Sequence, residues 1–179
     1  MFRSILSIVF SVFFLLGIAS PAIAASNAEI NAKSKQALKE FYRHSSAGKQ
    51  LFQQAKGALI FPEVYKAGFG IGGEYGEGKL VENGRTTGYY SIAAASIGFQ
   101  LGAQVKTEII LFMTDKALRQ FKQSDGWEAG VDGSIAVVTL GAGGEIDTST
   151  IKDPIIGFIF SNKGLMYNLS LEGSKITRK

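Results

Sequence analysis

The spacing of the apolar residues changes at Gly57, and this change constrains the fold more than any other feature of the sequence. Before Gly57, apolar residues recur at helical spacing and would form one apolar stripe, made up of Ile30, Ala37, Leu38, Phe41 and Tyr42. After Gly57, apolar residues alternate with small or polar ones, which is typical of strands. The chain is therefore expected to form helices first and a sheet afterwards.

The first helix is predicted from Ser26 to Arg43, because Ser26 and Glu29 have the spacing of a capping box. A second short helix is predicted over residues 47–55 and would end near Gly57. A third, at about 115–122, would be capped by Asp115.

Several short strands are predicted between and after these helices. Asn83-Gly84 is a strong signal for a two-residue hairpin turn. Pro62 is expected to stop the first strand. The strand over residues 97–105 is expected to have one dry face and one face of small or polar residues. The strands are expected at residues 59–61, 67–75, 80–81, 86–92, 97–105, 109–113, 134–140, 155–160 and 165–171. The predicted class is α+β: N-terminal helices followed by a Gly-rich, mostly antiparallel β-sheet, with rolling into a barrel left open.

Residues 1–24 have the features of an export signal. Arg3 precedes an apolar run over residues 5–19, Pro21 breaks the helix, and Ala22-Ile23-Ala24 has the small-x-small pattern of a cleavage site. The expectation is a signal peptide, 1–24, and one domain, 25–179, in the periplasm or secreted and peripheral to a membrane. Retention of the segment as an anchor is the alternative.

Composition excludes most enzyme classes. The 179 residues contain no Cys and one His, which removes disulfide scaffolds, thiolate metal sites, cysteine nucleophiles and multi-His centres. His44 beside Ser45 supplies no triad geometry. Neither catalysis, a cofactor nor a metal is expected.

Two other motifs have simple structural interpretations. Residues 68–73 are Gly-rich but precede no helix, so close backbone approach is favoured over nucleotide binding. Asp125, Glu128 and Asp132 cluster around Trp127, and two of them could act as a carboxylate pair in acid–base chemistry. They could equally form turns, which the glycines after Asp125 and Asp132 favour.

Basic residues recur every four positions along the first predicted helix. Lys35, Lys39 and Arg43 lie opposite its apolar stripe, and Lys33 flanks them. The arrangement is that of a basic amphipathic surface meeting anionic lipid, and the alternative is an ordinary solvated face. At about 1 kcal/mol each, four cations would contribute about 4 kcal/mol, near a thousandfold in affinity. Nucleic acid is not expected, because an exported chain does not meet it.

The sequence resembles the SYLF domain family in six ordered blocks. They are Ala55-Lys56-Gly57 with 66–69, residues 72–78 with 88–90, residues 112–118, residues 124–128, residues 163–165 and residues 171–176. The resemblance implies binding of phosphoinositides or other acidic lipids without catalysis. It assigns lipid contact to Lys33, Lys35, Lys39 and Arg43, which match the basic helix of eukaryotic members. Lys66, inside a matching block, is a further candidate.

Two expected departures from the family pattern bear on partners. An export signal is expected at residues 1–24, and the SH3 domain of the eukaryotic adaptors is not expected in this sequence. Actin is therefore not an expected partner, and any protein partner is unidentified. The alternatives are an envelope protein-interaction scaffold and a small outer-membrane β-barrel. If the helix packs on the sheet it offers only charge to a membrane, whereas a detached helix would also insert apolar residues.

Overall fold

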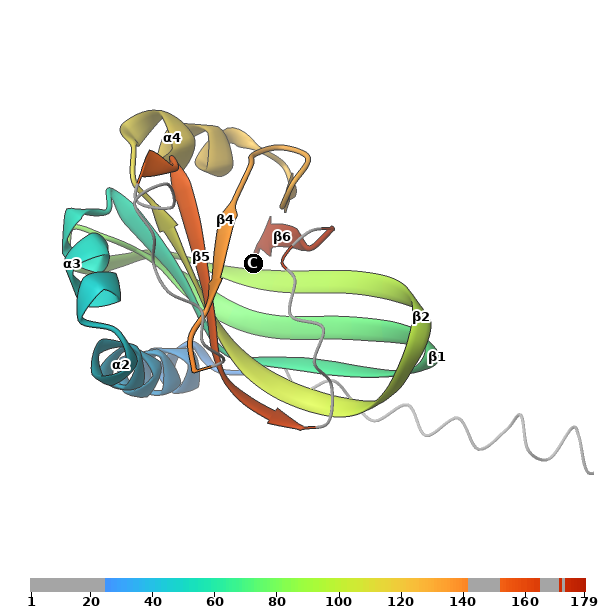
Figure 1. Ribbon diagram of the computed structural model, residues 1–179. Coiled ribbons are helices and arrows are strands. Elements are labelled where there is room, and N and C mark those ends of the chain that lie inside the picture. The colour runs from blue at the N-terminus through green and yellow to red at the C-terminus, as the bar shows by residue number, and fades with distance from the viewer. Residues whose placement is uncertain (1–24, 142–151, 165–170, 172) are drawn as a thin grey trace, which may run out of the picture.

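The computed structural model describes residues 25–141, 152–164, 171 and 173–179. In this part of the chain, helices pack against one end of a strongly curved sheet (Figure 1). The predicted α+β class and the mostly antiparallel sheet are confirmed. The predicted export signal, residues 1–24, and residues 165–170 of the last predicted strand lie outside the described residues.

Two helices open the described chain, α2 (Asn27–His44) and α3 (Ser46–Gln54). Ser26 caps α2, because its Oγ accepts a hydrogen bond from the backbone N–H of Glu29 at 3.2 Å. Ser45 lies between the helices and serves both: its N–H bonds the carbonyl of Phe41, and its Oγ accepts from the N–H of Gly48 at 2.8 Å. A single extended residue therefore turns the chain from one helix to the next.

The sheet is built on one long antiparallel hairpin. Strand β1 (Gly57–Glu82) pairs with β2 (Arg85–Phe112), from Glu82 opposite Arg85 to Gly57 opposite Phe112. Asn83 and Gly84 join them with φ values of 49° and 73°. Positive φ at both positions matches the right-handed twist of the strands, so the predicted hairpin turn is confirmed.

The hairpin curves so strongly that β1 approaches itself. A Cβ atom on Gly78 would lie 2.3 Å from the carbonyl oxygen of Ile60, and one on Gly76 would lie 2.9 Å from that of Glu63. Only glycine permits this approach of two backbones. The register shifts between Phe69 and Ile71, and the ribbons of β1 and β2 bend back there (Figure 1).

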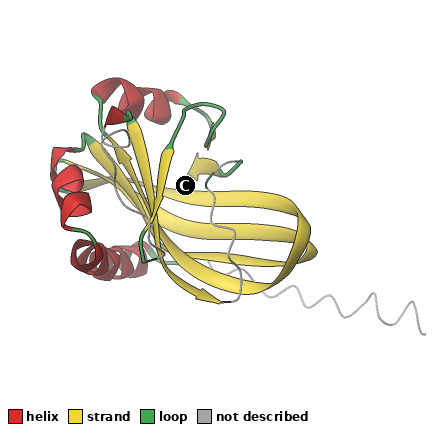
Figure 2. Cartoon of the chain, in the orientation of Figure 1, coloured by secondary structure: helices red, strands yellow, loops and turns green. Residues whose placement is uncertain are grey.

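The remaining strands add to β2. Its second half pairs with β5 (Ile155–Gly164), and its first half with β6 (Lys175–Arg178). Short strands extend the two sides: β4 (Ala136–Thr139) lies parallel to β5, and β3 (Trp127–Glu128) lies antiparallel to β6. In Figure 2 the described helices gather at one end of the sheet, away from the bend in β1 and β2.

Two apolar clusters occupy the two faces of the sheet. One includes Phe112 and Trp127 and is covered by α4 (Asp115–Gln123) through Phe121. The other includes Phe158 and is covered by α2 and α3. Residues 109–112, within the strand predicted at 109–113, are fully buried between these clusters.

Three local predictions were wrong. Thr114, not Asp115, caps α4, because its extended backbone lets Oγ1 accept from the N–H of Ala117. Pro62 does not end the first strand: β1 is an edge strand, so the missing N–H costs no ladder bond. The faces of the segment near 105 are reversed, since Gln104 is 2% exposed whereas Ala103 is exposed.

The reversal has a physical cause in the curvature of the hairpin. The inner face of the curved strands carries buried charged and amide groups, including Glu74 and Gln104. The outer face carries Tyr65, Ile71 and Tyr75, which are 54%, 73% and 48% exposed. Alternation fixes which residues share a face, but curvature decides which face is covered.

Candidate functional site

Helix α2 is fixed on the sheet by its apolar stripe. The ring of Phe41 is fully buried, with its centroid 4.9 Å from that of Phe158 and 5.7 Å from that of Phe160. Ile30 and Ala37, 1% and 5% exposed, bury the same side of the helix. Helical periodicity therefore directs positions 35, 39 and 43 away from the sheet.

Three basic side chains occupy this outer face. Lys35, Lys39 and Arg43 are all exposed and lie at successive intervals of four residues. Within the described residues, none of the three forms an ion pair. We call Lys35, Lys39 and Arg43 the basic stripe; its positive charge faces solvent.

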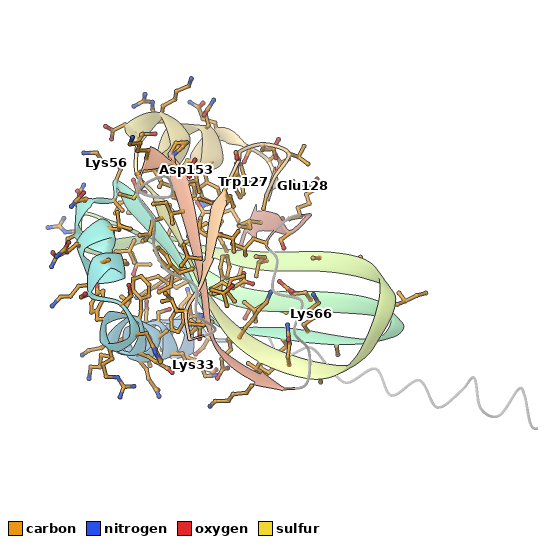
Figure 3. The ribbon with its side chains drawn as sticks, viewed as in Figure 1. Lys33, Lys56, Lys66, Trp127, Glu128 and Asp153 are labelled. Carbon is orange, nitrogen blue, oxygen red and sulfur yellow. The ribbon has the colours of Figure 1, made fainter. Side chains whose placement is uncertain are left out.

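Lys33 is held differently from the basic stripe. Its Nζ lies 2.8 Å from Glu29 Oε1 and 2.7 Å from Glu63 Oε2, so it joins α2 to β1 (Figure 3). Hydrogen bonds to Glu29 and to Glu63 raise the pKa of Lys33 well above its ordinary value. The same contact with Lys33 lowers the pKa of Glu63. The structure thus separates Lys33 from the three cations with which the sequence grouped it.

Lys66 is also separated from the basic stripe. It lies on β1, is 8% exposed and has an interaction of its own there. Figure 3 shows it on the long hairpin, away from Lys33 and α2. A buried ammonium group is not available to a bilayer surface in this conformation.

A cavity of about 410 Å³ lies where the start of α2 meets β1. Its polar lining is dominated by the carboxylates of Glu29, Glu63 and Glu77, with Lys33 among them. Tyr65 Oη and Tyr75 Oη donate to Glu63 and Glu77, at 2.9 and 3.0 Å. Because three of the four charged side chains that line it are acidic, this cavity is a poor receptor for an anionic headgroup, and the outer face of α2 is the better candidate.

A buried charged cluster inside the curved hairpin has no signal in the spacing of residues along the sequence. Lys106 Nζ lies 2.9 Å from Glu74 Oε2 and 2.7 Å from Glu108 Oε1, with all three side chains nearly inaccessible. Burial raises the pKa of Glu108 to about 7 against the opposing effect of the Lys106 ammonium. Burial alone would lower the pKa of Lys106, but the charges of Glu108 and Glu74 outweigh it and raise that pKa.

The acidic residues near Trp127 have the geometry of a turn. Asp132 Oδ2 accepts a hydrogen bond from the backbone N–H of Glu128 at 2.7 Å. In the described part of the chain, no group of His, Asp and Glu side chains is placed to hold a metal ion. Nor does any described helix have the length and apolar character needed to cross a bilayer.

Residues 93–179 match the sequence model of the Ysc84 family, described as Las17-binding protein actin regulator. The chain is also similar to SH3 domain-containing YSC84-like protein 1 of Xenopus laevis, with 26% identity over 159 residues, 82% of this chain and 47% of that protein. The Bos taurus protein of the same name is 29% identical over 126 residues, 68% of this chain and 37% of the relative. The chain thus spans less than half the length of these relatives. The resemblance to the SYLF family is confirmed.

Proposed function

We infer the function of this chain from its resemblance to the SYLF (Ysc84) domain family together with the basic stripe on α2. We propose that it is an exported, non-enzymatic module that binds anionic phospholipid or phosphoinositide headgroups. The partner would be a membrane surface, met without a cofactor. The observation that carries the proposal is the exposure of three cations, none ion-paired within the described residues, on the outer face of a helix whose opposite face packs on the sheet.

The strength expected of this surface follows from the number of available charges. A basic side chain near an anionic bilayer contributes about 1 kcal/mol, so Lys35, Lys39 and Arg43 together would contribute about 3 kcal/mol, on the order of a hundredfold in affinity. Lys33 adds less because two carboxylates already surround it. Such an affinity suits reversible, peripheral binding rather than permanent anchoring.

The packing of α2 favours an electrostatic mode of binding. Ile30 and Phe41 are buried against the sheet, so the docked helix presents charge and no large apolar side chain from its stripe. Interactions between exposed charges weaken with ionic strength, because the Debye length shortens to about 3 Å at 1 M salt. Binding to anionic vesicles should therefore be largely lost at high salt.

The test is sedimentation with vesicles of equimolar phosphatidylglycerol and phosphatidylcholine at low salt. Reversal of the whole basic stripe, Lys35→Glu with Lys39→Glu and Arg43→Glu, should abolish pelleting and leave the circular dichroism spectrum unchanged. A matched control reverses three exposed cations elsewhere, Lys56, Lys116 and Arg119, the last two on α4 across the sheet from α2. The control changes net charge equally and should retain most binding. Equal loss in both variants would show that net charge, not the basic stripe, binds lipid.

A second candidate function is protein binding within the cell envelope. The description of the Ysc84 family as Las17-binding favours a protein-interaction surface in that family. In this case the chain would form a stable complex with an envelope protein and would not pellet with vesicles at any headgroup composition. The vesicle experiment therefore separates the two candidates.

A further inference from the structure

The carboxylate of Glu77 contacts residues at both ends of the described chain, Ala25 and Lys179. Its Oε2 accepts from the backbone N–H of Ala25 at 2.5 Å, and its Oε1 lies 2.5 Å from Lys179 Nζ. Tyr75 Oη donates to the same Oε1 at 3.0 Å. Only 7% of the Glu77 side chain is exposed.

These contacts make Glu77 a strong acceptor. Burial by itself would raise the pKa of Glu77, but the donors Lys179, Ala25 and Tyr75 outweigh burial and lower it. The group is therefore a carboxylate at neutral pH, held in a partly buried position with a backbone nitrogen against one oxygen. A carboxylate in such a position would bind a positively charged donor more strongly than a neutral one.

We propose that Glu77 is the binding site for the α-ammonium group created when the peptide bond between Ala24 and Ala25 is hydrolysed. Water adds across this bond, leaving a carboxylate on Ala24 and an amine on Ala25 that takes up a proton. The Ala22-Ile23-Ala24 pattern places cleavage at this bond. The inference rests on the export included in the proposed function, and it adds that processing creates an ion pair inside the folded domain.

The position of Ala25 explains why such a pair would be useful to the fold. Ala25 directly precedes Ser26, the cap of α2, and a positive charge at the start of a helix opposes the helix dipole. The carboxylate of Glu77 offsets this unfavourable charge. The same part of α2 is tied to the hairpin by Asn31, which donates to Tyr89 Oη at 2.8 Å and accepts from Lys79 Nζ at 2.9 Å.

The proposal is tested by moving the ammonium group by one residue. Two proteins are compared, one beginning at Ala25 and one with a single Gly before Ala25, each released from a fusion without further residues. The chain beginning at Ala25 should have a folding equilibrium constant on the order of tenfold larger in urea titrations, as expected for a charge-assisted hydrogen bond. Equal stability of the two chains would overturn the proposal.

A matched pair of variants identifies the carboxylate. In Glu77→Gln the difference between the two chains should vanish. In Glu82→Gln it should persist, because Glu82 bonds Thr87 and Lys122 and does not contact Ala25. A difference that survives in Glu77→Gln would also overturn the assignment.

A further test measures the pKa of the Ala25 α-amine in the protein without any substitution, so it does not depend on the folding of a variant. Amines at chain ends ordinarily have a pKa of about 7.7–8.0, and pairing with Glu77 should raise that of Ala25 above this range in NMR titrations. The other charged groups around the position are Lys179 beside Glu77, and Glu29, Lys33 and Glu63 lining the adjoining cavity. An unshifted α-amine would contradict the proposal.

Intact-mass measurement of the protein recovered from the periplasm determines separately which residue is the first of the exported chain. A chain beginning at Ala25 supports the proposed processing, and a chain that retains residues 1–24 or begins elsewhere overturns it. Vesicle sedimentation does not depend on the urea titrations, the NMR titration or the mass measurement. Failure of the Glu77 site and failure of lipid binding would therefore be distinguishable.

Discussion

Lys33 Nζ and Glu63 Oε2 form an ion pair at 2.7 Å that connects α2 to β1 across 30 residues of sequence. This pair divides the basic residues of α2 into two groups. Lys33 links the helix to the sheet, whereas Lys35, Lys39 and Arg43 face solvent. The two groups should respond differently to neutralisation.

Neutralising Lys39 should weaken vesicle binding more than neutralising Lys33. Lys39→Gln should lower affinity about fivefold, the equivalent of about 1 kcal/mol, with no change in stability. Lys33→Gln should have a smaller effect on affinity and should cost up to about 1 kcal/mol of unfolding free energy, the usual range for an exposed ion pair. Flotation and urea titrations of the two proteins measure both quantities. The opposite order of affinities would place Lys33 within the lipid-binding surface.

Glycine should be required at position 78 and replaceable at position 73. A Cβ on Gly78 would lie 2.3 Å from the carbonyl oxygen of Ile60, so Gly78→Ala must push the two parts of β1 apart and should cost about 1–3 kcal/mol. Gly73 is exposed, and the nearest atom to its Cβ would be 4.0 Å away, at the carbonyl oxygen of Ala94. Gly73→Ala should therefore change stability little. Similar urea midpoints for both variants would contradict the close approach of the two backbones.

The buried carboxyl of Glu108 should make stability fall as pH rises toward neutrality. Its pKa is about 7 in the folded chain and near 4.5 when unfolded, so between these values the folded state binds more protons than the unfolded state. The free energy of unfolding should decline from about pH 4.5 to about pH 7. Carboxyls with a lowered pKa, such as Glu63, change the free energy of unfolding only below this pH window. Glu108→Gln should remove this decline in thermal unfolding measured across the window. If stability falls equally in Glu108→Gln, the pH dependence must come from a group other than Glu108.

Features that depend on neighbours along the chain could be predicted from the sequence. Ser26 and Glu29 located the start of α2, and Asn83-Gly84 located the hairpin turn. The exposed face carrying Lys35 and Lys39 followed from helical spacing alone. Each of these features needs only a few consecutive residues to be specified.

Features that depend on the curvature of the hairpin could not be predicted from the sequence. No spacing rule pairs Lys106 with Glu74, because they come together only when β1 and β2 bend back. Alternation likewise could not tell that Gln104 faces inward and Ile71 outward. The partner of Lys33 was missed for the same reason, since Glu63 lies on the edge of the curved sheet.

The central claim is that the basic stripe is the surface that meets anionic bilayers. The absence of Cys from the sequence permits a single fluorescent label at Ala32→Cys, an exposed position on the outer side of α2, or at Gln120→Cys on α4 as the matched control. Both are mixed with phosphatidylglycerol vesicles that contain a headgroup-attached quencher. The account predicts strong quenching at position 32 and little at position 120, with both signals restored to their starting values at high salt. Equal quenching at the two positions, or stronger quenching at position 120, would contradict it.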